Sequence, residues 1–202
     1  MPNSAIVHLV DDDEEVRRAL AFLLGTAGLA VRVYESADSL LAKLSSVSGG
    51  CIVSDVRMPG MSGIQLLQVL KEKQIGLPVI IMTGHADIAL AVEAMKAGAM
   101  DFLEKPFDDE TLIGAIHSVL NHQQNPWNES GNAEIRARLA TLSDREKQVL
   151  EGLLKGHPNK TTAYDLGISP RTVEVHRANV MRKMAASSLS ELVRMSLAAG
   201  TF

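Results

Sequence analysis

The sequence has a single cysteine and no apolar run long enough to cross a membrane. The lone Cys51 cannot form an internal disulfide, and no cluster of cysteine and histidine suggests a zinc site. A membrane helix needs about 20 consecutive apolar residues, and the first residues, Met-Pro-Asn-Ser, lack the basic and apolar regions of a signal peptide. We therefore expect a cytoplasmic protein that does not interact with membranes.

Charge is distributed unevenly along the 202 residues. Residues 1–124 hold nine Lys and Arg against sixteen Asp and Glu, which gives −7, whereas residues 134–202 hold eleven against seven, which gives +4. The length and the 46% hydrophobic content suit two small domains with real cores. An acidic module is therefore expected to precede a basic one.

The first module alternates short apolar runs with stretches of helical periodicity, which is typical of βαβ units around a parallel sheet. The continuous apolar character of the runs suits strands that are buried on both faces. We predict a doubly wound five-stranded α/β fold. Its strands are Ile6–Val10, Val31–Tyr34, Cys51–Ser54, Val79–Met82 and Asp101–Leu103.

Charged or hydroxyl residues follow four of these strands: Asp11 to Asp13, Asp55, Thr83 and Lys105. Parallel strands share one carboxyl edge, so these side chains are predicted to meet in one crevice. The carboxylates suit Mg²⁺, and Asp55 could act as a nucleophile that forms an acyl phosphate. Thr83 and Lys105 could each bind a phosphoryl oxygen. Taken singly, each residue could instead be a helix cap, a turn or surface charge, but the full set favours a common site.

A polar stretch without periodicity, which contains Pro126 and Gly131, separates the two modules. We predict a first domain over residues 1–122, a partly helical linker over 123–138, and an all-α domain of four helices over 139–202. Helix-start signals mark this last domain: capping boxes at Ser143–Glu146 and Ser188–Glu191, and an N-cap followed by proline at Ser169–Pro170.

A short helix, a turn containing glycine and a long helix over residues 170–184 form the layout of a helix-turn-helix, whose second helix enters the DNA major groove. Val173, His176, Val180 and Met184 follow helical spacing and should face inward, with His176 hydrogen-bonded in the core. Charges on an exposed helix could simply be solvated, but the turn favours DNA. The predicted DNA contacts are Lys160, Arg171, Thr172, Glu174, Val175, Ala178 and Arg182.

Residues 4–122 resemble the receiver domains of two-component response regulators. The resemblance rests on Asp11–Asp12, on Asp55 followed by Val-Arg-Met-Pro-Gly, on Thr83–Gly84 and on Lys105–Pro106. It implies a flavodoxin-like sheet of order 2-1-3-4-5, Asp55 as the phosphoacceptor, and a cis Lys105–Pro106 bond.

The same resemblance implies a metal site and a switch. Mg²⁺ would be bound by Asp12, Asp55 and the backbone carbonyl of Arg57, and Asp11 would support it through water. Phe102 would be the switch aromatic that responds when Thr83 moves towards the phosphoryl group. The implied chemistry is limited to Mg²⁺-dependent self-phosphorylation and self-dephosphorylation at Asp55, so the protein is expected not to be an enzyme.

Residues 139–200 are similar to the LuxR-type helix-turn-helix family, and the combined order resembles the FixJ subgroup of response regulators. This similarity rests on Leu-Ser-Asp-Arg-Glu from residue 142, on Asn159–Lys160 and on Ile-Ser-Pro-Arg-Thr-Val-Glu from residue 168. The pair Thr161–Thr162 departs from the apolar residue usual in the scaffold helix.

The resemblance to the FixJ subgroup implies a transcription activator in a phosphorelay that starts at a partner histidine kinase. The other implied partners are double-stranded promoter DNA, RNA polymerase and a second copy of the chain, which would join on phosphorylation through the receiver and the last helix. The implied targets are nitrogen-fixation or microaerobic genes.

Two alternatives remain open at this point. An aspartate-nucleophile phosphohydrolase uses similar strand-end residues, but it normally needs a second aspartate two residues after the nucleophile, where this chain has Arg57. A receiver domain could also control an RNA-binding or protein-binding output.

Overall fold

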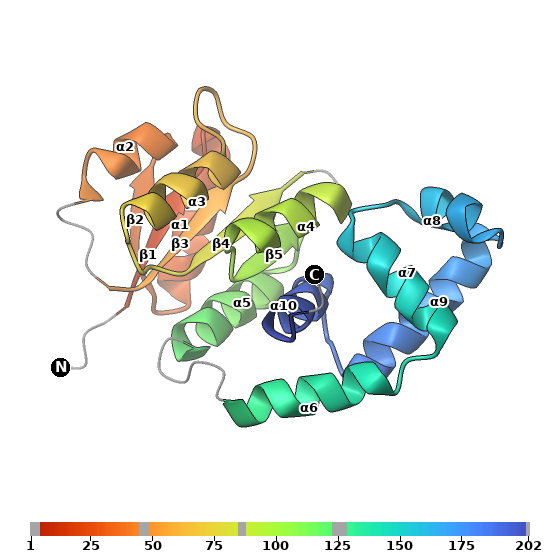
Figure 1. Ribbon diagram of the computed structural model, residues 1–202. Helices are drawn as coiled ribbons and strands as arrows, with labels where there is room; N and C mark the ends of the chain where they lie inside the picture. Colours follow the sequence, from red (N-terminus) through yellow and green to blue (C-terminus); the bar gives the residue numbers. More distant parts are fainter. Residues whose placement is uncertain (1–4, 45–48, 85–87, 123–128, 201–202) are drawn as a thin grey trace. The chain divides into compact units, whose positions relative to one another are not determined.

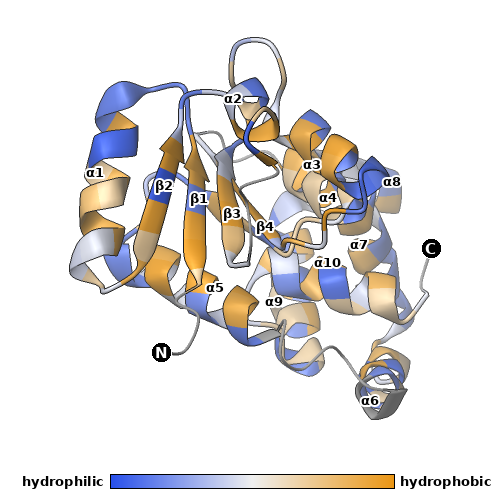
Figure 2. Cartoon of the chain, turned by 90° about the vertical axis from the view of Figure 1, so that its left-hand side faces the viewer, coloured by the Kyte–Doolittle hydropathy of each residue, from blue (hydrophilic) through white to orange (hydrophobic). Residues whose placement is uncertain are grey.

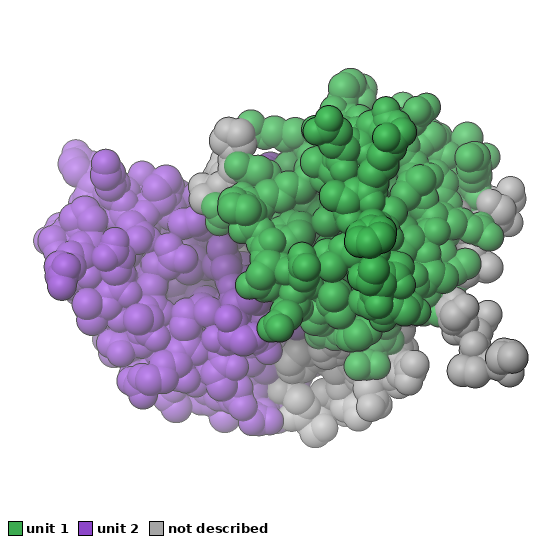
Figure 3. Space-filling model, turned by 180° about the vertical axis from the view of Figure 1, so that it is seen from behind, with its two compact units in different colours: residues 1–86, 97–125 green, residues 87–96, 126–202 purple. Residues whose placement is uncertain are grey.

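The computed structural model describes residues 5–44, 49–84, 88–122 and 129–200. The chain divides into two compact units, one of residues 1–86 and 97–125 and the other of residues 87–96 and 126–202 (Figure 3). None of the helices in these described ranges is long and apolar enough to cross a membrane.

The first unit contains a five-stranded parallel sheet of order β2-β1-β3-β4-β5, which confirms the predicted topology (Figure 1). The strands extend one residue beyond most predicted carboxyl ends, because main-chain hydrogen bonds continue there: the Val56 N–H donates to Met82 O at 2.8 Å and the Lys105 N–H to Thr83 O at 2.6 Å. The strands are β1 (Ile6–Val10), β2 (Ala30–Tyr34), β3 (Cys51–Asp55), β4 (Val79–Thr83) and β5 (Asp101–Glu104).

In the described part of the chain, the helices that connect or follow these strands are α1 (Glu14–Thr26), α2 (Ala37–Leu41), α3 (Gly63–Glu72), α4 (Ile88–Ala97) and α5 (Asp109–His122). Helix α2 has only five residues and starts at a capping box in which Ser36 and Ser39 exchange hydrogen bonds. A helix of this length shows too little apolar periodicity to be located from sequence.

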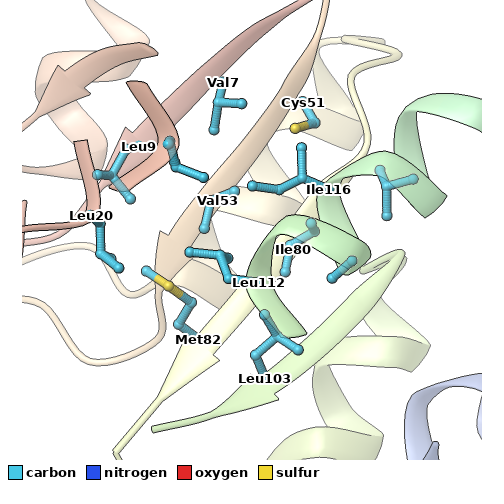
Figure 4. Packing of buried hydrophobic residues seen from close by; sticks show 13 residues of the cluster. Val7, Leu9, Leu20, Cys51, Val53, Ile80, Met82, Leu103, Leu112 and Ile116 are labelled. Carbon is cyan, nitrogen blue, oxygen red and sulfur yellow. The ribbon is translucent and has the colours of Figure 1, made fainter. Parts of the chain in front are cut away.

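The core of this unit forms where α1 and α5 cover one face of the sheet. Leu9, Val53 and Met82 from neighbouring strands pack with Leu20 of α1 and Ile116 of α5 (Figure 4). Every residue of β3 and β4 is buried, so the opposite face is covered as well. The central strands are accordingly mostly hydrophobic (Figure 2).

The carboxyl-terminal part consists of α6 (Glu129–Ala140), α7 (Asp144–Leu154), α8 (Asn159–Leu166), α9 (Pro170–Met184) and α10 (Leu189–Ala198). The predicted start of α7 at a Ser143–Glu146 capping box is confirmed, as is the start of α9 at Ser169 with proline in the first turn. Gly167 ends α8 with φ +65°, in the left-handed conformation that glycine adopts readily. Helix α6 begins inside the segment predicted as a partly helical linker.

Two sequence-based expectations for these helices were wrong in detail. Ser188 accepts from the Glu191 N–H, but the Glu191 carboxylate accepts from the N–H and hydroxyl of Ser187 instead of the Ser188 N–H, so the second capping box is only half formed. His176 is only half-buried, and its Nδ1 is buried without a hydrogen-bond partner among the described residues.

The helix-turn-helix packs around Val149 of α7, Ala163 of α8 and Val173 of α9. Thr162, the polar departure in α8, is buried and lies against Gly152 of α7, where an added Cβ would come within 2.8 Å of the threonine hydroxyl. The absence of a side chain at residue 152 therefore makes room for the threonine.

A partly buried ion pair joins α7 to the end of α9. Lys183 Nζ lies 2.7 Å from Oε2 of Glu146, which also accepts the Ser143 N–H at 2.7 Å. The Lys183 hydrogen bond and the Ser143 N–H lower the pKa of Glu146 to about 2. The ionised carboxylate is therefore part of both the helix cap and the helix packing.

Glu146→Gln should lower the stability of the α7–α9 region by about 1 kcal/mol, since the amide oxygen can still accept but its hydrogen bonds with Lys183 and Ser143 lose the charge of the carboxylate. Hydrogen exchange of residues 144–184 measures this loss. Glu151→Gln is the matched control, because it removes an exposed pair with Lys155 and should leave exchange nearly unchanged.

The stabilisation by Glu146 should depend on pH. Because its folded pKa lies below the ordinary value of 4.5, the contribution is complete above about 4.5 and is lost as pH falls towards about 2. The difference between wild type and Glu146→Gln should therefore shrink over that window. A difference that stays constant from neutral pH to about 2 would contradict the ion-pair account.

Candidate functional site

The side chain of Lys105 joins two of the predicted carboxylates at the carboxyl edge of the sheet. Its Nζ lies 2.8 Å from Asp11 Oδ2 and 2.7 Å from Asp55 Oδ1. Asp11 follows β1, Asp55 ends β3 and Lys105 follows β5. The structure thus brings together three of the residues predicted to share this crevice.

The environment of Lys105 keeps its side chain charged. Burial acts to lower the pKa of Lys105, but hydrogen bonds to Asp11 and Asp55 and their charges raise it above its usual value. Asp11 is 1% exposed and Asp55 8% exposed, so one ammonium lies among two largely buried carboxyl groups. When both are ionised, the trio carries a net charge of −1, which favours a further cation beside it.

The remaining carboxylate oxygens are held by the backbone. The Arg57 N–H donates to Asp55 Oδ2 at 2.7 Å, and the Asp13 N–H donates to Asp11 Oδ1 at 2.9 Å. Arg17 also donates from Nη1 to the Asp11 carbonyl at 2.6 Å. Each carboxylate therefore has one oxygen on Lys105 and the other on an amide, which fixes its orientation.

The three consecutive aspartates have different places. Asp11 is buried in the pocket, Asp12 is exposed, and Asp13 is the N-cap of α1, where its carboxylate accepts the N–H groups of Glu15 and Val16. The capping role explains the third aspartate without any part in the pocket.

Thr83 and Phe102 lie on the neighbouring strands β4 and β5. Thr83 is fully buried at the end of β4, and Phe102 is half-buried opposite Ile81 in the register of the two strands. The Lys105–Pro106 peptide bond is cis, as the resemblance to receiver domains implied.

The oxygen donors at this edge fit Mg²⁺ in kind. Mg²⁺ takes hard oxygen ligands and usually needs only one or two protein carboxylates besides waters and phosphate oxygens. The described residues contain no group of three or more His, Cys, Asp and Glu that could hold a metal by themselves. The aspartate oxygens at this edge are hard donors of the kind that Mg²⁺ takes together with other oxygen ligands.

Gly63 is a positioning residue that the sequence reasoning missed. An added Cβ there would lie 2.4 Å from the Asp55 carbonyl oxygen, and the Gly63 N–H donates to the Val56 carbonyl at 3.0 Å. The only sequence signal was glycine after the N-cap Ser62, where a helix normally needs none. Only glycine lets α3 start so close to the main chain of Asp55 at the end of β3.

The predicted DNA-contact face is open in the structure. Thr172 is half-buried, and its hydroxyl is 2.8 Å from that of Ser169, so part of its hydrogen-bonding capacity serves the helix start. Behind this face, the half-buried Arg177 donates to Asn159 at 2.8 Å and joins α9 to the start of α8. The exposed members of the predicted set are Lys160, Arg171, Glu174, Val175, Ala178 and Arg182.

Tyr164 on α8 is 88% exposed and was not among the predicted contacts. The spacing of residues in the short helix α8 gave no indication that the Tyr164 side chain would be exposed.

Comparisons with known proteins match both parts of the chain. Residues 7–117 match the response regulator receiver domain, and residues 140–196 match the bacterial regulatory proteins of the luxR family. The chain is 56% identical over 201 residues to the transcriptional regulatory protein FixJ of Azorhizobium caulinodans, covering 99% of this chain and 95% of that one. It is 44% identical to the C4-dicarboxylate transport transcriptional regulatory protein DctR of Rhodobacter capsulatus, covering 96% and 100%.

A solved structure resembles the chain over nearly its whole length. The crystal structure of full-length FixJ from B. japonicum aligns with a TM-score of 0.59 at 50% identity and covers 98% of both chains.

Gly63→Ala should destabilise the first unit by about 1–3 kcal/mol, because the new methyl group must displace the Asp55 backbone. Urea unfolding measures the change. Gly114→Ala is the control, since nothing lies within 4 Å of the added atom and α5 should gain about 0.4–1 kcal/mol. Equal stability of the two variants would show that the close approach at Gly63 is not tight.

Proposed function

The chain belongs to the two-component response regulators that join a receiver domain to a LuxR-type DNA-binding domain, and it is similar to the FixJ transcriptional regulators. We therefore propose that Asp55 accepts a phosphoryl group from a partner histidine kinase. The observation that carries this proposal is the contact of one ammonium, Lys105, with both Asp11 and Asp55. This contact places a positive charge beside Asp55, where it can bind a phosphoryl oxygen when a bound metal ion neutralises the carboxylates.

The proposed reaction is a phosphoryl transfer between two side chains. An oxygen of Asp55 forms a bond to phosphorus while the bond from phosphorus to the kinase histidine breaks, and the histidine nitrogen keeps the electron pair of that bond. The Arg57 N–H holds the other carboxylate oxygen and so orients the attack.

The proposed Mg²⁺ ligands are Asp12, Asp55 and the Arg57 carbonyl, with Asp11 acting through water. Magnesium, when bound, would screen the repulsion between the carboxylates and the phosphoryl oxygens. Self-phosphorylation by small phosphodonors and self-dephosphorylation by water are proposed to use the same residues.

Lys105 and Thr83 are proposed to read the new group. The ammonium exchanges its contact with Asp55 for one with a phosphoryl oxygen, and the Thr83 hydroxyl donates to another. Movement of Thr83 leaves space that the Phe102 ring can enter, which changes the surface around β5.

The proposed output is DNA binding by a dimer. We propose a receiver over residues 1–122, a linker over 123–138 and a DNA-binding domain over 139–202, with receiver surfaces and α10 as dimer contacts. Two recognition helices reading two half-sites bind more tightly than one. RNA polymerase is the proposed further partner, and nitrogen-fixation or microaerobic genes are the proposed targets.

The exposed face of α9 suits base reading. Glu174 can accept from cytosine, Val175 and Ala178 can contact thymine methyl groups, and Arg171 and Arg182 can bind guanine or phosphate. Lys160 and Thr172 lie at helix amino termini, where phosphate contacts are favourable. The relatives match along nearly the whole chain, which favours this reading over a phosphohydrolase or an RNA-binding output.

Acetyl phosphate with Mg²⁺ should add the mass of one phosphoryl group to the wild type and tighten its binding to duplex DNA selected from a random library. Asp55→Asn should do neither, because the amide lacks the nucleophilic oxygen charge. Intact-mass spectrometry and gel shifts measure both effects, with RNA of the same sequence as the control ligand. Equal mass gain in the variant would remove Asp55 as acceptor, and equal RNA binding would remove the DNA assignment.

A further inference from the structure

The carboxyl end of the recognition helix α9 is held by side chains and carbonyls from the segment 134–146. Arg138 of α6 donates from Nη1 to the Met184 carbonyl at 2.8 Å. Lys183 donates to the Thr141 carbonyl at 3.1 Å as well as to Glu146. The last turn of α9 is thus attached to α6 and to the loop that follows it.

The Arg138 contact satisfies a helix-end carbonyl. The last carbonyls of a helix have no partner within the helix, and a cation near them is favoured by the helix dipole. At this end the chain turns through Ala185, a non-glycine residue with φ +53°, whose N–H returns to the Arg182 carbonyl. The guanidinium of Arg138 supplies a charged donor for the Met184 carbonyl.

Arg138 is itself held among acidic groups. Its Nη2 lies 2.7 Å from Glu134 one turn earlier on α6. Burial acts to raise the pKa of Glu191 on α10, but hydrogen bonds from Ser187 and the charges of Arg194 and Arg138 bring it below its usual value. Arg138 therefore interacts with groups on α6, α9 and α10 at once.

Helix α6 packs closely against other helices of the carboxyl-terminal part. Ile135, one turn before Leu139, is 2% exposed, and α6 packs against both α9 and α10. The same helix is the first one that follows residues 123–128 along the chain. A displacement that enters the DNA-binding part from its amino-terminal side must therefore pass through α6.

We propose that Arg138 is a positioning residue that couples α6 to the recognition helix, so that a shift of α6 changes the placement of α9 on DNA. The inference rests on the proposed function, since it names the link by which receiver phosphorylation alters DNA affinity. Arg138 does not contact DNA in this account. It acts through the Met184 carbonyl.

The decisive quantity is the ratio of DNA dissociation constants without and with acetyl phosphate, measured on the full chain with the same selected duplex. Arg138→Ala should reduce this ratio by about tenfold, or to one if the wild-type ratio is smaller, since couplings of this kind are typically about 5- to 150-fold. Arg138→Lys should keep part of the ratio, because an ammonium can still donate to the carbonyl without the planar fork.

Arg136→Ala is the matched control, because it removes the same charge from an exposed position of the same helix. It should leave the ratio unchanged. Intact-mass spectrometry confirms equal phosphorylation of all variants, and thermal unfolding reports any loss of fold. If Arg138→Ala does not fold, Arg138→Lys compared with Arg136→Ala decides the question.

A purely structural role predicts a different pattern. Both dissociation constants of Arg138→Ala would then rise together and the ratio would equal that of the wild type, which overturns the coupling. If neither wild type nor Arg136→Ala gains affinity on phosphorylation, the proposed function fails and the coupling with it. A gain in wild type and in Arg136→Ala that is about tenfold smaller in Arg138→Ala, or absent from it, supports both the proposed function and the coupling.

Discussion

The contact of the Lys105 ammonium with Asp11 and Asp55 is the interaction on which the receiver pocket depends. Largely buried carboxylates are costly unless they are paired and hydrogen-bonded. The sheet order brings the charged groups together. Asp11 and Asp55 follow or end the neighbouring strands β1 and β3, and Lys105, which follows β5 in the same sheet, contacts both carboxylates. Backbone amides complete each carboxylate, and Gly63 allows the helix after β3 to begin against the Asp55 carbonyl.

In the carboxyl-terminal helices, charged side chains are likewise paired and hydrogen-bonded. Their charged groups are joined at helix ends, where backbone groups lack partners. Glu146 closes the start of α7 and pairs with Lys183, and Arg138 binds the last carbonyl of α9. The exposed face of α9 is left for a ligand. The hydrogen bonds at the helix ends therefore determine how α9 is positioned, and the exposed side chains along α9 determine which ligand it can bind.

Strand positions and strand-end residues could be predicted because continuous apolar runs and their polar endings are local signals. The starts of α7 and α9 were likewise readable from caps. What could not be predicted depends on contacts that residue spacing does not specify. The Glu191 carboxylate binds Ser187, so the box at Ser188 is only half formed, and Nδ1 of His176 is buried without a hydrogen-bond partner among the described residues. Gly63 needed the position of the Asp55 carbonyl.

Calorimetric titration with Mg²⁺ tests most directly whether Lys105 balances the charge of this pocket. Lys105→Met should bind Mg²⁺ at least about tenfold more tightly than wild type, because both carboxylates lose their cation. Lys73→Met, which removes an exposed lysine at the end of α3, should bind as the wild type does. Unchanged or weaker Mg²⁺ binding by Lys105→Met would contradict the account.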